Sequence, residues 1–234
     1  MNERSLSIDL DGGDSVSAVL RVPQETDQNR CELLALAHGA GTDMRSAFLS
    51  FICESVAAAG IATLKFNFPY KEKGRKAPDP AQKLEATWRS VLDRLRSDPA
   101  LDFATVFVGG KSLGGRMASR VVAQGEPVAG LVLLGYPLHP PGKPEKQRTE
   151  HFPDIRVPSL FIQGSRDPLC DLALLGEALP RIPSSVDLHL VEGGDHSFNV
   201  LKRMGVPQGQ VWNDIVATVV EWITDRSRAN PAER

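Results

Sequence analysis

Short runs of consecutive apolar residues alternate along this chain with longer segments whose apolar residues recur at helical spacing. The six runs lie at residues 33–37, 61–66, 105–108, 131–134, 159–162 and 186–191. Runs of this length are typical of strands that are covered by helices on both faces. Their alternation with helical segments predicts an α/β fold with a mainly parallel central sheet flanked by helices. Ligands of such sheets bind beyond the carboxyl ends of the strands, so function is expected in the loops that follow them.

Two further patterns complete the predicted fold. Residues 6–10 and 16–20 alternate apolar and polar side chains, which predicts two antiparallel strands joined near residues 12–13. Helical apolar stripes occur at residues 48–56, 84–95, 113–121 and 211–222. The chain has 234 residues and no internal repeat or linker. We therefore expect residues 1–234 to form a single domain.

Composition excludes several classes of function. The 27 basic residues are balanced by 29 acidic ones, so no basic excess exists to bind nucleic acid. The longest segment without a charge, residues 127–142, contains four prolines and is too short to span a membrane. The three cysteines are widely spaced and the start of the chain lacks an apolar signal region, so we expect a cytoplasmic protein without disulfides. The sequence leaves the oligomeric state open.

A candidate nucleophile follows the run at 105–108. Gly110, Ser112 and Gly114 form a G-x-S-x-G motif between a predicted strand and a predicted helix, which is the nucleophile-elbow pattern. The serine is held there in a strained turn, and larger side chains two residues away on either side would collide. A P-loop would need glycine where Thr105 stands, and a dinucleotide fingerprint would need a small residue at Met44. The remaining alternative is that the serine only caps its helix.

Residues 38–41 follow the run at 33–37 and read His-Gly-Ala-Gly. In enzymes with a nucleophile elbow, the loop at that position supplies one N–H of an oxyanion hole, and the residue after the nucleophile supplies the other. We therefore expect the backbone N–H groups of Ala40 and Leu113 to form the oxyanion hole, with Gly41 as the next candidate. We interpret His38 as a structural residue that holds this loop.

A serine nucleophile needs a base, and the base needs an acid that orients it. Asp167 follows the run at 159–162, and His196 lies in a glycine-containing loop after the run at 186–191. The order Ser112, Asp167, His196 is that of the α/β-hydrolase fold. Asp195 is the rival acid, but a residue adjacent to the histidine usually points elsewhere. The other histidines have no comparable context and are expected to be surface or packing residues.

The chain resembles the α/β-hydrolase superfamily over nearly its whole length. It is similar in particular to small predicted bacterial hydrolases, whose eukaryotic relatives include a testis-expressed hydrolase-like protein and a subunit of a histone-acetylation complex. It also resembles dienelactone hydrolases, which use a cysteine where Ser112 stands. The resemblance implies the fold and a catalytic triad but no particular substrate. It rests on residues 38–41, 66–70, 74–76, 109–116, 163–168 and 194–198.

Two segments bear on the shape of the site. Residues 137–158, where relatives often insert a helical cap, contain six prolines and no helical stripe, so we expect an irregular loop and an open site. Residues 67–80 are rich in lysine and arginine, which either steer an anionic substrate or are simply solvated; the solvated alternative is favoured. The role of Lys111, beside the candidate nucleophile, is equally open.

These features predict a serine hydrolase with a Ser-His-Asp triad that acts on a small ester, thioester or amide. Two alternatives are an acyltransferase that uses the same triad and a non-catalytic interaction protein that keeps the fold. No metal motif is present and the five histidines are scattered, so no metal or cofactor is expected. The expected partner is a small acyl substrate, with neither nucleic acid nor membrane.

Overall fold

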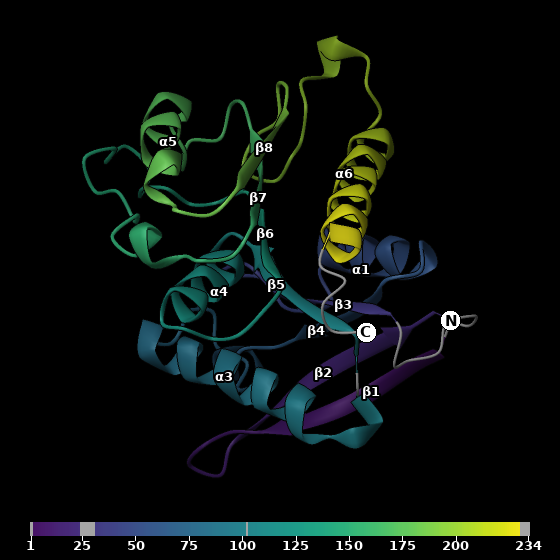
Figure 1. Cartoon of the computed structure of the whole chain (residues 1–234). Helices are drawn as coiled ribbons and strands as arrows, with labels where there is room; N and C mark the ends of the chain where they lie inside the picture. Colours follow the sequence, from purple (N-terminus) through teal and green to yellow (C-terminus); the bar gives the residue numbers. More distant parts are fainter. Residues whose placement is uncertain (1, 24–30, 102, 230–234) are drawn as a thin grey trace.

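One mixed sheet organises the computed structural model, which describes residues 2–23, 31–101 and 103–229. The described residues contribute eight strands to this sheet, in the order β1-β2-β4-β3-β5-β6-β7-β8 (Figure 1). Strand β2 pairs in antiparallel fashion with both β1 and β4, whereas the remaining neighbours pair in parallel. The strands are β1 (Asn2–Asp9), β2 (Ser15–Val22), β3 (Glu32–Ala37), β4 (Ala62–Phe66), β5 (Thr105–Lys111), β6 (Gly130–Leu134), β7 (Ser159–Gly164) and β8 (Val186–Val191).

Helices cover both faces of the sheet. α1 and α6 lie on one face, and α3, α4 and α5 lie on the other (Figure 1). The predicted mainly parallel α/β architecture is therefore confirmed. The helices are α1 (Ala47–Ala58), α2 (Pro69–Glu72), α3 (Ala81–Ser97), α4 (Leu113–Ala123), α5 (Leu172–Ala178) and α6 (Gln208–Ala229), and short 3-10 turns occur at Pro99–Leu101, Phe152–Asp154, Leu179–Arg181 and Lys202–Met204.

Strand β3 is apolar from Leu33 to Ala37 because each of its faces packs on a separate core. In β3, Leu33 and Ala35 join the core beneath α3 and α4, while Leu34 and Leu36 join the core beneath α1 and α6. All four side chains are fully buried. Successive side chains of a strand point to opposite faces, so a strand that is buried on both faces favours apolar residues at successive positions.

The prediction that every apolar run is covered on both faces is wrong for β8. This strand lies at the edge of the sheet and pairs only with β7 among the described strands. Leu188 and Leu190 remain 40% and 43% exposed. The run at 186–191 also contains Asp187 and His189, and these polar residues were the sign of an edge strand.

Segment 137–158 builds no helical cap among the residues that the structure describes, as the prolines predicted. Its regular structure is limited to the 3-10 turn Phe152–Asp154. The apolar side chains of Leu138, Phe152 and Ile155 are fully buried in the core beneath α4 and α5. The Tyr136 hydroxyl, just before the segment, donates a hydrogen bond to the Arg148 carbonyl at 2.6 Å. The loop is thus irregular but firmly packed.

All three cysteines are buried. Burial raises the pKa of the Cys53 and Cys170 thiols to about 12, so neither is a thiolate near neutral pH. In the described part of the chain, no helix combines the length and apolarity needed to cross a bilayer.

Candidate active site

Ser112 occupies a sharp turn between β5 and α4. Its backbone φ of 51° and ψ of −114° lie where few non-glycine residues are found. A Cβ atom at Gly110 or at Gly114 would overlap the carbonyl oxygen of Ala37 on the neighbouring strand β3. The two glycines of the motif are therefore steric requirements of the turn. The Ser112 side chain makes no capping hydrogen bond to its helix, so the helix-cap alternative does not describe it.

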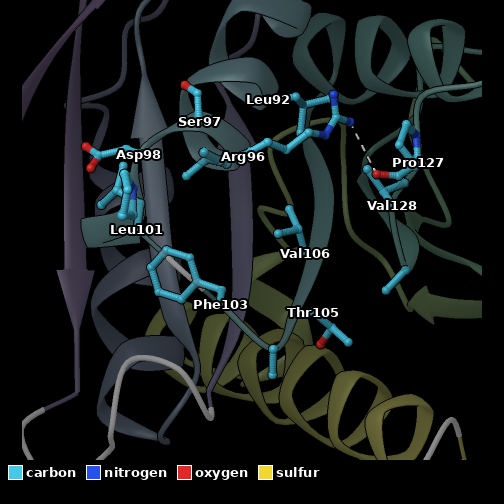
Figure 2. Close-up of a pocket in the computed structure, with 14 residues that line it drawn as sticks. Leu92, Arg96, Ser97, Asp98, Leu101, Phe103, Thr105, Val106, Pro127 and Val128 are labelled. Carbon is cyan, nitrogen blue, oxygen red and sulfur yellow. Dashed lines mark hydrogen bonds between the residues drawn. The ribbon is translucent and has the colours of Figure 1, made fainter. Parts of the chain in front are cut away.

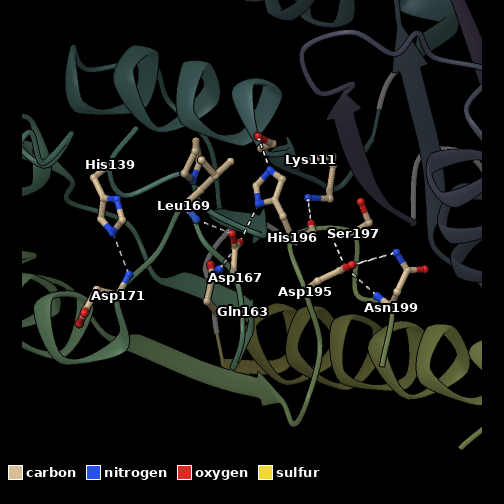
Figure 3. A network of polar contacts seen from close by, with 12 residues as sticks. Lys111, His139, Gln163, Asp167, Leu169, Asp171, Asp195, His196, Ser197 and Asn199 are labelled. Carbon is tan, nitrogen blue, oxygen red and sulfur yellow. Dashed lines mark hydrogen bonds and ion pairs between the residues drawn. The ribbon is translucent and has the colours of Figure 1, made fainter. Parts of the chain in front are cut away.

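The structure brings the three predicted triad side chains together. His196 Nε2 lies 2.9 Å from Ser112 Oγ, and His196 Nδ1 lies 2.6 Å from Asp167 Oδ2 (Figure 3). The Asp167 carboxylate is completely buried, whereas the His196 side chain is 24% exposed. The imidazole can therefore reach a solvent-side substrate while its acid partner is shielded from water.

Asp167 is held by two hydrogen bonds besides the one with His196. Gln163 Nε2 donates to Asp167 Oδ2 at 2.7 Å, and the Leu169 backbone N–H donates to Oδ1 at 2.8 Å. A buried carboxylate must have its oxygens satisfied, because an unpaired one is costly. These donors fix the orientation of the carboxylate. Sequence analysis assigns Gln163 no role, although its position at the end of β7, four residues before Asp167, is the signal that could have indicated one.

Asp195 is occupied elsewhere. Its carboxylate accepts hydrogen bonds from the backbone N–H groups of Ser197 and Asn199 at 2.8 and 2.9 Å (Figure 3). Partial burial opposes ionisation, but these hydrogen bonds hold the pKa of Asp195 below its usual value. Asp195 therefore closes the turn that presents His196, and Asp167 is the carboxylate that contacts the imidazole.

The loop at residues 38–41 lies against the nucleophile turn. A Cβ atom at Gly39 would lie 3.6 Å from Ser112 Cβ. His38 is fully buried, with Nδ1 2.8 Å from the Gly39 carbonyl oxygen and Nε2 3.1 Å from the Phe68 backbone nitrogen. Both ring nitrogens are thus used in holding the loop, and burial lowers the pKa of His38. The next residue, Ala40, is exposed, and Leu113 is half-buried at the start of α4.

Most cations of the 67–80 segment have partners within the chain. Lys73 pairs with Asp14 at 2.6 Å and Arg75 pairs with Asp79 at 2.5 Å. Lys71 lies 6.0 Å from the ring centre of Tyr70. Part of the segment forms the short helix α2.

His139, which the sequence predicted to be a surface or packing residue, supports the site. Its Nδ1 lies 3.0 Å from the Pro140 carbonyl oxygen, and its Nε2 accepts the Asp171 backbone N–H at 3.0 Å. This bond ties the 137–158 segment to the loop after β7, which carries Asp167. Nothing in the surrounding sequence distinguishes this histidine from a surface one.

A cavity of about 640 Å³ lies at the opposite end of the sheet (Figure 2). Thr105 and Val106 at the start of β5 line it, together with Leu92, Arg96 and Val128. Ser112 follows the other end of the same strand. The cavity is therefore separate from the triad.

Comparisons with known proteins agree with this fold. A family model described as an alpha/beta hydrolase domain matches residues 30–224. The chain belongs to the α/β-hydrolase family. Among solved structures it is similar to a dienelactone hydrolase from Anabaena variabilis, with a TM-score of 0.78 and 22% sequence identity over 96% of this chain and 97% of that one.

Two further structures share this α/β-hydrolase fold at comparable distance. A serine hydrolase from Xanthomonas campestris described as lacking a lid has a TM-score of 0.73 and 18% identity, over 100% of this chain and 98% of that one. A structure described as a cold-adapted esterase from an Arctic intertidal metagenomic library has a TM-score of 0.69 and 19% identity, over 94% of this chain and 93% of that one.

Proposed function

We propose that this chain is a serine hydrolase that cleaves small esters, thioesters or amides through an acyl-enzyme on Ser112. The observation that carries the proposal is the unbroken contact from Ser112 Oγ through the His196 imidazole to the buried Asp167 carboxylate. A strained serine, a base within hydrogen-bond reach and an orienting acid are the parts that acyl transfer requires.

The reaction follows from the positions of these atoms. Ser112 Oγ attacks the substrate carbonyl carbon while its proton passes to His196 Nε2. The resulting oxyanion is stabilised by the N–H groups of Ala40 and Leu113 and by the N-terminus of α4. The bond to the leaving group then breaks, and the leaving group takes the proton from Nε2. Water attacks the acyl-enzyme in the same way, releasing the acid and restoring Ser112.

Asp167 has two roles in this scheme. Because its carboxylate accepts from Nδ1, the imidazole keeps Nε2 free to accept the serine proton. Its charge also stabilises the imidazolium that forms when that proton arrives. The buried carboxylate is effective because little water screens it.

The substrate class is proposed from the loops and the neighbours. Structures described as a cold-adapted esterase and as a lidless serine hydrolase share the fold, which supports ester cleavage with an open site. We propose that residues 1–234 form one domain that acts on a small acyl substrate. We propose a cytoplasmic localisation for the protein. The intact triad contacts favour turnover over the non-catalytic role that the resemblance to the testis-expressed protein raised.

A fluorophosphonate probe tests the proposal. We expect a covalent adduct on Ser112, located by mass spectrometry, together with hydrolysis of p-nitrophenyl acetate. Ser112→Ala should abolish both. Ser197→Ala, which removes an exposed hydroxyl next to His196, is the matched control and should retain both. Labelling that survives Ser112→Ala would overturn the assignment of the nucleophile.

A further inference from the structure

Lys111, immediately before Ser112, connects two parts of the site that are far apart in sequence. Its side chain turns away from solvent, and Nζ donates a hydrogen bond to the backbone carbonyl of His196 at 2.5 Å (Figure 3). The ammonium also lies 5.1 Å from the ring centre of Phe198. The strand that carries the nucleophile is thereby joined directly to the loop that carries the base.

The residues around the Lys111 ammonium leave space for it. A Cβ atom at Gly135, after β6, would lie 2.7 Å from Lys111 Nζ, so a larger residue there would displace the lysine. Asp167 after β7 and Asp195 after β8 attract its charge, but neither forms an ion pair with it among the described residues. Burying an ammonium without a paired carboxylate is costly, so such a group marks a functional position.

We propose that Lys111 is a positioning residue that anchors the His196 backbone, and that its charge makes activity depend on pH. This inference rests on the proposed hydrolase function. The turn it anchors is strained, since Phe198 adopts a left-handed φ of 62° with its side chain fully buried. The Asp195 carboxylate closes this turn, while Lys111 holds the His196 carbonyl from outside it. A shift of about 1 Å in a catalytic group lowers rates by about a hundredfold.

The expected pH dependence has a definite direction. Burial lowers the pKa of Lys111 to about 8, partly offset by the charges of Asp167 and Asp195. The charged groups that act on it are these two carboxylates, and its hydrogen-bond partner is the His196 backbone carbonyl. As pH rises through about 8 the ammonium becomes an amine and a weaker donor. We therefore expect kcat/KM to fall on the alkaline side of pH 8.

Two substitutions test this proposal against a purely structural role. Lys111→Met keeps most of the stem but removes the donor, and we expect kcat to fall by about 10- to 100-fold with KM within about threefold. The alkaline fall in kcat/KM should disappear. Lys65→Met is the matched control, because Lys65 is also buried but bonds Ser50 beneath α1, away from the triad. This control should keep the wild-type pH profile even if it lowers stability.

Hydrogen–deuterium exchange gives a readout that does not need turnover. Lys111→Met should speed exchange of the backbone amides at 195–199, and Lys65→Met should not. A Lys111→Met protein with wild-type kcat, an unchanged alkaline fall or unchanged exchange would overturn the proposal. If the wild-type chain neither hydrolyses esters nor labels at Ser112, the proposed function fails, while exchange at 195–199 still decides whether Lys111 anchors the turn.

Discussion

The two halves of the candidate site are held in shape by different forces. The nucleophile turn at 109–115 is fixed by backbone crowding, since a Cβ at Gly109 would overlap the carbonyl of Val132 and one at Gly115 would lie 2.6 Å from the carbonyl of Gly110. The loops that carry Asp167 and His196 are fixed by polar side chains at strand ends, Gln163 in β7 and Lys111 in β5. The geometry of the first half depends on glycines that lack a side chain, and that of the second half depends on polar side chains that form hydrogen bonds.

This difference determines how each half fails. Adding a methyl group to the turn forces strands apart, because packed backbone cannot yield. Removing one polar side chain from the acid–base loops leaves the fold intact but releases a catalytic group. We therefore expect replacement of the glycines in the turn to act on stability, and removal of polar side chains from the loops to act on rate.

The largest expected effect is a difference in kcat between substitutions of Asp167 and of Asp195. Asp167→Asn should lower kcat by about 10⁴-fold, because an amide donor at this position favours the wrong imidazole tautomer. Asp195→Asn should lower kcat by less than about tenfold, since an amide oxygen still accepts the backbone N–H groups of Ser197 and Asn199. Steady-state kinetics with p-nitrophenyl acetate measures both. Equal losses would mean that Asp195 shares the role of the acid.

The second effect concerns the turn. Gly114→Ala should destabilise the protein by at least about 3 kcal/mol, because its Cβ overlaps the backbone of Ala37 and His38. Gly176→Ala in α5 is the matched control, since nothing lies within 4 Å of a Cβ there. It should be neutral or stabilise slightly, because alanine favours helix. Urea unfolding of both variants checks this, and a Gly114→Ala protein of wild-type stability would contradict the crowding argument.

The same contrast explains how far the sequence alone could reach. The role of the glycines around Ser112 could be predicted from the sequence because only glycine fits in such a crowded turn. The assignment of Ser112, Asp167 and His196 followed from their positions after predicted strands. The hydrogen bonds by which Lys111 and His139 hold the loops of His196 and Asp167 could not be predicted from the sequence. Both act through backbone carbonyls or N–H groups that every residue has, so no partner residue type marks the contact. The exposure of Leu188 was mispredicted because the run at 186–191 was treated as apolar, although Asp187 and His189 interrupt it and β8 is the last strand of the sheet.

The smallest expected effect concerns the acyl chain of the substrate. The apolar residues of the 137–158 segment, including Leu138 and Phe152, are buried in the core and are not free to line a long acyl pocket. Each methylene that a site buries contributes about 0.8 kcal/mol, or about fourfold in kcat/KM. An open site gains little of this energy, so kcat/KM should level off or fall beyond about four acyl carbons.

Measuring kcat/KM for p-nitrophenyl esters from acetate to decanoate decides between an open and a covered site. The comparison between the two halves predicts a plateau, because the site is bounded by polar loop contacts and a crowded backbone rather than by a lid. A steady rise of about fourfold per methylene through the long chains would require apolar cover over Ser112. That cover would have to come from movement of the 137–158 segment or from a second chain. Repeating the series at several protein concentrations separates these two sources, since only a second chain makes the slope concentration-dependent.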